Sequence, residues 1–128
     1  MMIEFVRIHH VSLAVRDLEK SKKFYSEILR FREIDRPPFS SSGVWYAVGD
    51  QQLHLLEHPE GQTLRDQGID TTDGHFAMWV QSYQKTIDWL DNNGVHYEAR
   101  PESVAGFAQI FILDIDHNII ELSADYGS

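Results

Sequence analysis

The sequence contains no cysteine, and this absence excludes several kinds of site. Disulfide bridges, zinc ribbons and thiol nucleophiles all require that residue. The sequence also has no run of about 18 apolar residues, so a transmembrane helix is not expected. The N-terminal stretch MMIEFVRIHH lacks the apolar segment of a secretion signal. A cytoplasmic protein with no membrane partner is therefore the expectation.

Positive charge is scarce as well. The chain has 11 lysines and arginines against 20 aspartates and glutamates, and its formal net charge is -9. Nucleic-acid-binding proteins normally carry a basic patch, so nucleic acid is not an expected partner. The 128 residues are 42% hydrophobic and 24% charged, which is an ordinary globular balance. This length is sufficient for one domain with a hydrophobic core.

The first half of the chain predicts the element order βαβββ. The segment RIHHVSLAVRDL alternates apolar residues with small or polar ones, as a half-buried strand does. Asp17 is a good N-cap for a helix over about 18–29. After a loop at 36–43, the segments VWYAVG and QLHLLE are typical of a hairpin that turns at Gly49 and Asp50.

The second half predicts the same order after a polar, glycine-rich linker at 58–74. HFAMWV is an expected strand, Ser82 caps an expected helix that Gly94 ends, and three strands follow. The shift that places His10 on His75 also places Asp17 on Ser82. The sequence therefore predicts a single domain, 1–128, made of two βαβββ modules at about 5–57 and 75–125. The apolar rows expected to be buried against the helices are Val11, Leu13, Val15, Phe76, Met78, Ile120 and Leu122.

Four polar residues occupy matching places in this repeat. His10 and His75 open the first strand of each module, whereas His54 and Glu121 lie in the last strand, within QLHLL and IIELS. Each lies opposite the apolar row, so we expect all four to face the hollow of the sheet. Three imidazoles and a carboxylate predict a site for one divalent transition metal: Zn, Ni, Co, Mn or Fe.

Each of these residues also has an ordinary structural interpretation. A lone histidine on a strand is more often structural than a ligand, and a strand glutamate usually faces solvent. The matching positions favour ligands, with His54 the weakest member of the set. Trp79 shares the strand face of His75, so it is expected either to line the cavity or to pack at a dimer seam.

Three segments resemble the vicinal oxygen chelate superfamily: HHVSLAVRDLEKSKKFYSEILRF, GHFAMWV and LDIDHNIIELS. Its members include glyoxalase I, fosfomycin-resistance thiol transferases, bleomycin-resistance proteins, extradiol dioxygenases and methylmalonyl-CoA epimerases. The resemblance implies an α+β fold in which the two modules form an open mixed β-barrel around a metal. It places His10, His54, His75 and Glu121 on the metal positions. It also implies a homodimer in which each site draws ligands from both chains.

Two departures from the family pattern stand out. Ile115 and His117 replace a proline and a glycine in the turn before the last strand. Histidine tolerates left-handed backbone better than most residues do, so the turn changes and the ligand does not. Ala14 stands where glyoxalase I carries an arginine that contacts glutathione, and this weakens the expectation of glutathione recognition.

The resemblance favours a metal-dependent lyase or isomerase related to glyoxalase I (lactoylglutathione lyase). Such an enzyme holds a small oxygen-rich substrate through two oxygens on the metal. Glu121 and His54 are the candidate catalytic residues, since either can move a proton. Trp79, Arg100 and Phe107 are the candidate substrate-binding residues.

Three other functions stay open at this point. They are a thiol transferase of the fosfomycin-resistance type, a non-enzymatic drug-binding protein of the bleomycin-resistance type, and an extradiol dioxygenase. A site for a phosphonate needs a cationic cluster. Arg7, Arg36, Arg65 and Arg100 are available for one, although none lies in a recognisable motif.

Overall fold

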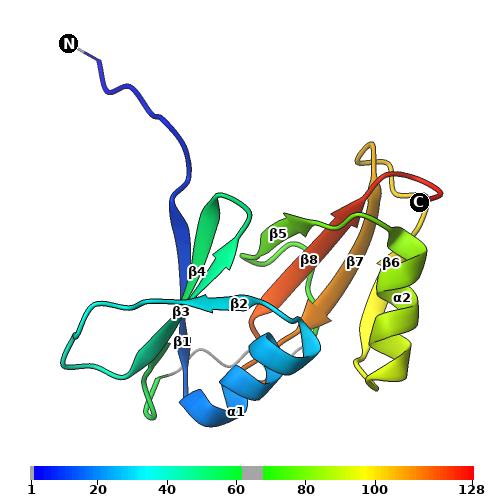
Figure 1. Ribbon diagram of the computed structural model, residues 1–128. Helices are drawn as coiled ribbons and strands as arrows, with labels where there is room; N and C mark the ends of the chain where they lie inside the picture. Colours follow the sequence, from blue (N-terminus) through cyan, green and yellow to red (C-terminus); the bar gives the residue numbers. More distant parts are fainter. Residues whose placement is uncertain (1, 62–67) are drawn as a thin grey trace. The chain divides into compact units, whose positions relative to one another are not determined.

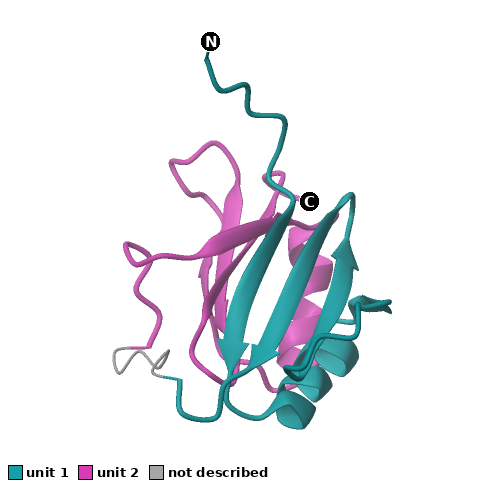
Figure 2. Cartoon of the chain, turned by 90° about the vertical axis from the view of Figure 1, so that its left-hand side faces the viewer, with its two compact units in different colours: residues 1–61 teal, residues 62–128 magenta. Residues whose placement is uncertain are grey.

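The computed structural model describes residues 2–61 and 68–128. The chain divides into two compact units, 1–61 and 62–128 (Figure 2). The division falls within the predicted linker 58–74, of which 58–61 and 68–74 contain no helix or strand. Residues 62–67 of that linker lie outside the described residues. The union of both units into one domain stays a prediction.

The first unit is a four-stranded mixed sheet with one helical segment (Figure 1). Its strands are β1 (His10–Val15), β2 (Arg32–Ile34), β3 (Gly43–Val48) and β4 (Gln51–Glu57), in the spatial order β1-β4-β3-β2. β1 and β4 are parallel, and the other two pairings are antiparallel. The hairpin of β3 and β4 turns at Gly49 and Asp50 as predicted, with Gly49 at a φ of 59°.

The helical segment covers the predicted residues but changes its winding. α1 (Leu18–Lys22) begins after Asp17, whose carboxylate accepts a hydrogen bond from the Lys20 amide at 3.1 Å. The chain then continues as a π-helix, η1 (Lys23–Ile28), in which the Leu29 amide donates to the Phe24 carbonyl. The prediction of a helix over about 18–29 is therefore confirmed, and the π-helical winding of its second half is a feature that the sequence did not indicate. The apolar spacing of this segment suits either winding, because the hydrogen bonds of the two helices differ in spacing by only one residue.

The second unit repeats the first (Figure 1). Its strands are β5 (Phe76–Trp79), β6 (Tyr97–Arg100), β7 (Ala108–Leu113) and β8 (Ile119–Ala124), in the order β5-β8-β7-β6. β5 and β8 are parallel and the remaining pairs antiparallel, as in the first unit. The predicted α+β class and the two βαβββ modules are thereby confirmed.

The residues predicted to begin and end the helix of the second unit do so. α2 (Tyr83–Asn92) begins after Ser82, whose hydroxyl accepts from the Lys85 amide at 3.1 Å. Gly94 adopts a φ of 65° just past its end, a left-handed conformation that glycine reaches without strain. His117 also adopts a positive φ, 63°, as expected for the position where the family carries glycine.

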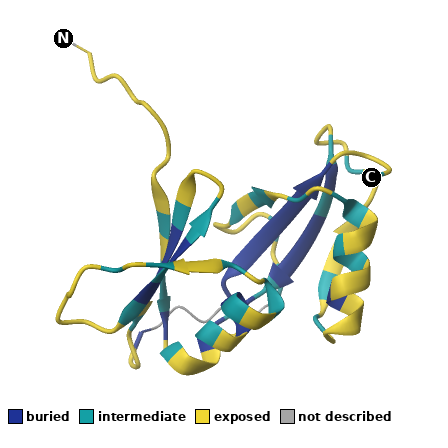
Figure 3. Cartoon of the chain, in the orientation of Figure 1, coloured by how far each residue is buried: buried dark blue, intermediate teal, exposed yellow. Residues whose placement is uncertain are grey.

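The expected apolar rows are buried to different degrees. Val15, Ile120 and Leu122 are fully buried. The other four members of the rows, Val11, Leu13, Phe76 and Met78, are half-buried. β1 and β5 lie at the edges of their sheets, which leaves their side chains partly uncovered, whereas β8 lies inside its sheet and is buried along its whole length (Figure 3). Among the described helices, none is long and apolar enough to cross a membrane.

Candidate functional site

His10 and His54 come together on neighbouring parallel strands of the first unit. The register pairs Ser12 with His54, so His10 lies two residues away along the same face of β1. The two imidazole rings are stacked, with centroids 4.2 Å apart and planes at 18°. The Nδ1 atoms of His9 and His10 lie 2.9 Å apart, which makes one ring the donor and the other the acceptor.

The ring of His54 is held on both faces. Trp45 of β3 stacks on the side away from His10, with centroids 4.0 Å apart and planes at 3°. The Nε2 atom of His54 bonds the side-chain oxygen of Gln52 at 2.8 Å. The Nε2–H therefore donates, and the free lone pair of the neutral ring is on Nδ1. The side chain is fixed in position and only 7% exposed.

The charge state of His54 suits a metal ligand. Burial, followed by the charges of the nearby His10, His9 and Arg36, lowers the pKa of His54 to about 4. The imidazole is therefore neutral at neutral pH. Metal ions bind this neutral form, because a protonated ring has no free lone pair.

His75 and Glu121 form the corresponding pair in the second unit. The register pairs Ala77 with Glu121, and His75 again lies two residues earlier. The Nδ1 atom of His75 lies 2.8 Å from the Asp73 carbonyl, so this nitrogen carries a hydrogen and donates it. The Nε2 atom lies 3.1 Å from Oε1 of Glu121. In the neutral ring this nitrogen is an acceptor facing another acceptor, an arrangement that a proton or a bound cation stabilises.

The second carboxylate oxygen of Glu121 is held by two neighbouring side chains. Gln109 of β7 donates to Oε2 at 3.2 Å, and the Ser123 hydroxyl donates to it at 2.8 Å. Glu121 is only 5% exposed. A buried carboxylate needs such donors, since burial without hydrogen bonds is costly. The donors also fix the direction of Oε1.

The donor set fits a divalent transition metal. Within residues 2–61 and 68–128, no three histidine, aspartate or glutamate side chains gather in one metal-binding cluster. The four predicted ligands instead form two pairs, one in each unit. Three imidazole nitrogens and a carboxylate are the atoms that such metals prefer. The neutral ring of His54 and the facing acceptors of His75 and Glu121 agree with that chemistry, while the assignment as ligands stays a prediction.

The predicted substrate-binding residues lie in two places. Trp79 is 59% exposed and contacts Phe107 edge to face, with centroids 5.7 Å apart. The guanidinium carbon of Arg100 lies 5.3 Å from the ring centre of Phe111, whose ring in turn contacts His75. Arg100 therefore reaches the second pair through Phe111, whereas Trp79 and Phe107 form a separate aromatic contact.

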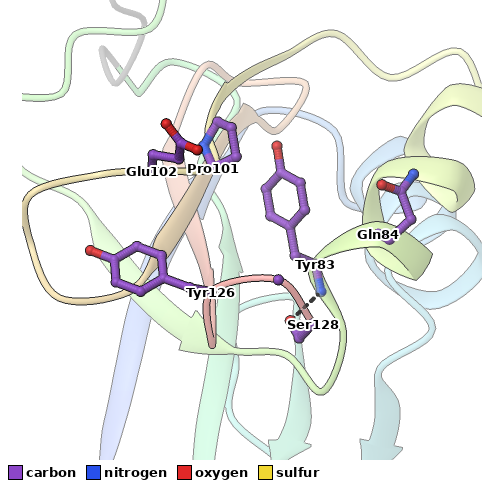
Figure 4. Close-up of a pocket in the computed structure, with 7 residues that line it drawn as sticks. Tyr83, Gln84, Pro101, Glu102, Tyr126 and Ser128 are labelled. Carbon is purple, nitrogen blue, oxygen red and sulfur yellow. Dashed lines mark hydrogen bonds between the residues drawn. The ribbon is translucent and has the colours of Figure 1, made fainter.

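A hollow of about 370 Å³ covers the first pair. Its lining residues are His9, His10, Ser12, Arg36, Phe39, Ser41, Trp45, His54 and Leu56. A larger hollow, of about 750 Å³, lies beside the start of α2 in the second unit (Figure 4). Tyr83, Glu102 and Tyr126 line that hollow, and it contains none of the predicted site residues. Of the predicted site residues, His10 and His54 line the smaller hollow.

Several residues at the two pairs were not found from the sequence. They are Trp45, Gln52, Gln109 and Ser123. A signal for Trp45 was present, because a hairpin that turns at Gly49 and Asp50 places Trp45 directly opposite His54. Arg36 was one of four arginines without a motif, and only the structure brings it to the histidine pair.

Comparison with known proteins adds two relatives and a solved structure of one of them. A protein of Vibrio parahaemolyticus described as a "Probable lactoylglutathione lyase" is 34% identical, over 91% of this chain and 88% of its own length. The fosfomycin resistance protein FosX of Listeria monocytogenes is 27% identical, over 91% of this chain and 88% of its own length. A solved structure of a FosX variant, with Mn(II) and 1S,2S-dihydroxypropylphosphonic acid bound, has a TM-score of 0.71 at 23% identity and covers 97% of this chain and 94% of that one.

Comparison of the fold with solved structures agrees with these sequence relatives. A solved glyoxalase family structure from Bacillus anthracis has a TM-score of 0.82 at 20% identity and covers 98% of this chain and 99% of that one. A model of the Glyoxalase/Bleomycin resistance protein/Dioxygenase superfamily matches residues 7–122. This match runs from just before His10 to just beyond Glu121. Since it takes in both modules and both polar pairs, the chain belongs to the Glyoxalase/Bleomycin resistance protein/Dioxygenase superfamily.

Proposed function

We propose that the chain is a metal-dependent lyase or isomerase of the glyoxalase type. His10, His54, His75 and Glu121 would together hold one divalent transition metal, and a small oxygen-rich substrate would bind it through two oxygens. The observation that carries the proposal is the equivalence of the two pairs. Each pair spans parallel strands with the same offset of two residues.

The residues divide the chemical work between them. The bound metal would stabilise negative charge that develops on a substrate oxygen. His54 is stacked between His10 and Trp45, so we assign it the role of a fixed ligand and not of a base that swings free. Glu121 is assigned the proton transfer, because Gln109 and Ser123 hold its Oε2 while Oε1 makes no hydrogen bond to either and lies against His75.

The relatives support this proposal in two ways. The family includes a lactoylglutathione lyase relative at 34% identity, the highest value among the relatives named above. The FosX variant holds Mn(II), an ion that histidine and carboxylate ligands suit. Ala14 weakens the expectation of glutathione recognition and leaves open which thiol the substrate carries.

The direct test is the metal content of protein purified without a histidine tag. Supplied in turn with Zn, Ni, Co, Mn and Fe(II), the protein is expected to retain about one ion per complete set of four ligands. The loaded protein is then assayed with the hemithioacetals that methylglyoxal forms with glutathione and with other thiols. Failure to retain any of the five ions would overturn the proposal and favour a non-enzymatic binder.

We also propose a homodimer in which each site takes His10 and His54 from one chain and His75 and Glu121 from the other. A single βαβββ module has exposed sheet edges that a second module would cover. The test mixes a His10→Ala chain with a Glu121→Gln chain under conditions that exchange subunits. In a shared-site dimer, both lesions fall in one site, so about half the sites of the mixed dimer recover metal. Exchange without recovery would place each site within one chain.

A fosfomycin-type transferase is the second candidate, and one observation favours it. Arg36 lines the hollow over His10 and His54, and a phosphonate substrate requires such a cation. Incubating the metal-loaded protein with fosfomycin, alone and with a thiol, distinguishes the two functions. Consumption of fosfomycin without turnover of any hemithioacetal would replace the first proposal by the second.

A further inference from the structure

Arg36 is held in place beside the first histidine pair by contacts with Ser41 and Phe39. Its Nη1 donates to the Ser41 carbonyl at 2.9 Å, and its Nη2 donates to the Ser41 hydroxyl at 3.1 Å. Its guanidinium carbon lies 4.9 Å from the ring centre of Phe39. The guanidinium is thus oriented by the loop 36–43 and does not sweep freely through solvent.

One donor of this guanidinium has no acceptor. The Nε atom of Arg36 is buried and makes no hydrogen bond within residues 2–61 and 68–128. Buried polar groups in native proteins are nearly always hydrogen-bonded, and an unpaired donor on a charged group is especially unfavourable. Because this atom is enclosed, a ligand in the hollow that Arg36 lines can supply the acceptor only after a small shift of the side chain.

The strand beneath Arg36 is shaped for this position. A Cβ atom placed on Gly43 would lie 3.0 Å from both Cζ and Nε of Arg36 and would collide with the Leu55 carbonyl. Any larger residue at 43 would therefore push the guanidinium away. The bare backbone lets the guanidinium lie close against β3.

The second unit offers a direct comparison. Ile34 pairs with Trp45 and Glu98 pairs with Phe111, and an arginine follows two residues later in each unit, Arg36 and Arg100. Arg100 is exposed, and its Nη2 reaches Thr71 at 3.3 Å. Both units thus carry an arginine at the same position. The buried, unsatisfied Nε and the hollow belong to the first.

We propose that Arg36 forms an oxyanion-binding subsite that selects small substrates carrying a carboxylate or phosphonate group. The Nε–H and the remaining Nη hydrogens form the fork that a guanidinium presents to two oxygens of one anion. The hollow of about 370 Å³ suits a small molecule, and Trp45 and Phe39 supply flat apolar walls. As part of a substrate site the subsite rests on the proposed function, whereas anion binding itself requires no metal.

The test measures anion binding to the full, metal-free chain by calorimetry at about pH 8, where free imidazole is neutral. Malonate and methylphosphonate are the oxyanion probes, and malonamide is the neutral control. At least one oxyanion is expected to bind and malonamide is not. Arg36→Gln is expected to weaken the binding by about tenfold or more, and Arg36→Lys to recover only part of it. Arg32→Gln removes the same charge from exposed β2 and is expected to change affinity by less than about twofold.

Three results would overturn the subsite: binding of neither oxyanion, equal binding of malonamide, or equal losses in Arg36→Gln and Arg32→Gln. If Arg36→Gln fails to fold, the Nε–H resonance of Arg36 in the parent, assigned with Arg36→Lys, provides the second measurement. Malonate or methylphosphonate must shift that resonance.

Metal titration separates this inference from the proposed function. Arg36→Gln is expected to retain metal as the parent does, because Arg36 is not a ligand. Oxyanion binding by a parent that retains no metal would refute the metal-dependent function and leave the subsite standing. Metal retention without oxyanion binding would do the reverse.

Discussion

The two modules have the same topology and register, yet they surround their polar pairs differently. In the first, the ring of His54 is stacked between His10 and Trp45. In the second, Oε2 of Glu121 accepts hydrogen bonds from Gln109 and Ser123, and Oε1 lies against Nε2 of His75. An imidazole is a flat ring that aromatic faces can cover, whereas a buried carboxylate needs hydrogen-bond donors. The two modules differ in this residue, His54 in the first and Glu121 in the second, and the neighbouring side chains differ accordingly.

This difference extends to the neighbouring pair in the register. Gly43 pairs with Leu56 in the first module, and Gln109 pairs with Ser123 at the corresponding place in the second. Gln109 and Ser123 both bond Glu121, so they are the carboxylate's own supports. His54 needs no such donors. Gly43 has no side chain, and Arg36 lies in the space that a side chain there would fill. The second module thus orients the carboxylate of Glu121, whereas the first carries Arg36, the proposed binding group for a substrate anion.

The largest expected effect concerns an equivalent core position in the two modules. Leu55 of β4 and Leu122 of β8 occupy corresponding positions and are both buried. Leu55→Ala and Leu122→Ala are each expected to lower the free energy of unfolding by about 2–5 kcal/mol. Leu56→Ala is the matched control, because Leu56 is the next residue and is 38% exposed. Chemical denaturation measures all three. A cost at Leu56 equal to that at Leu55 would mean that the two faces of β4 have been exchanged, and the placement of His54 would fall with it.

The next effect concerns the second pair. Glu121→Gln keeps the shape of the side chain and removes its charge, so the expected loss of metal affinity is about 100-fold or more. The fold is expected to survive, since an amide can still bond Gln109, Ser123 and His75. Competition with a fluorescent chelator measures the affinity, and thermal unfolding checks the fold.

Glu98→Gln is the control for that charge change. Glu98 lies in the same sheet, opposite Phe111, with its side chain exposed. It is expected to leave metal affinity unchanged within about twofold. Equal retention of metal by Glu121→Gln and Glu98→Gln would show that Glu121 is not a ligand.

Much of the fold could be predicted because its signals are local. Asp17 and Ser82 cap helices through bonds to amides three residues away, and Gly94 ends a helix by its own conformation. The turn at Gly49 and Asp50 fixes the register of a hairpin. The π-helical winding of 23–28 could not be predicted, because the same apolar spacing fits two helices.

The site was accessible from the sequence only in part. Alternation on a strand and the internal repeat bring His10 to His54 and His75 to Glu121. Trp45 and Gln109, which contact His54 and Glu121, come from neighbouring strands. A loop residue such as Arg36 follows no period at all. Its place depends on Ser41, Phe39 and the missing side chain at Gly43, a combination that only the folded loop reveals.

A smaller effect sharpens the comparison of the supports. Ser123→Ala removes one of the two donors to Oε2 of Glu121. The expected loss of metal affinity is about tenfold, as for other residues that orient a ligand. Ser40→Ala, which removes an exposed hydroxyl from the loop 36–43, is expected to have no measurable effect. Equal small effects in the two variants would show that Gln109 alone is sufficient to orient the carboxylate.

The smallest expected effect compares the starts of the two helices, which the modules support in the same way with different chemistry. The Leu18 amide donates to the Glu57 carboxylate at 2.8 Å, and the Tyr83 amide donates to the Ser128 hydroxyl at 2.9 Å. A carboxylate bonds an amide more strongly than a hydroxyl does, and its charge also favours the positive end of the helix dipole. Glu57→Ala is therefore expected to lower the free energy of unfolding by about 1 kcal/mol and Ser128→Ala by about 0.5 kcal/mol. Glu57→Gln, which keeps an acceptor and loses the charge, is expected to fall between parent and Glu57→Ala, and high salt is expected to narrow its distance from the parent. Equal costs for Glu57→Ala and Ser128→Ala in low salt would show that the charge contributes nothing at the helix start.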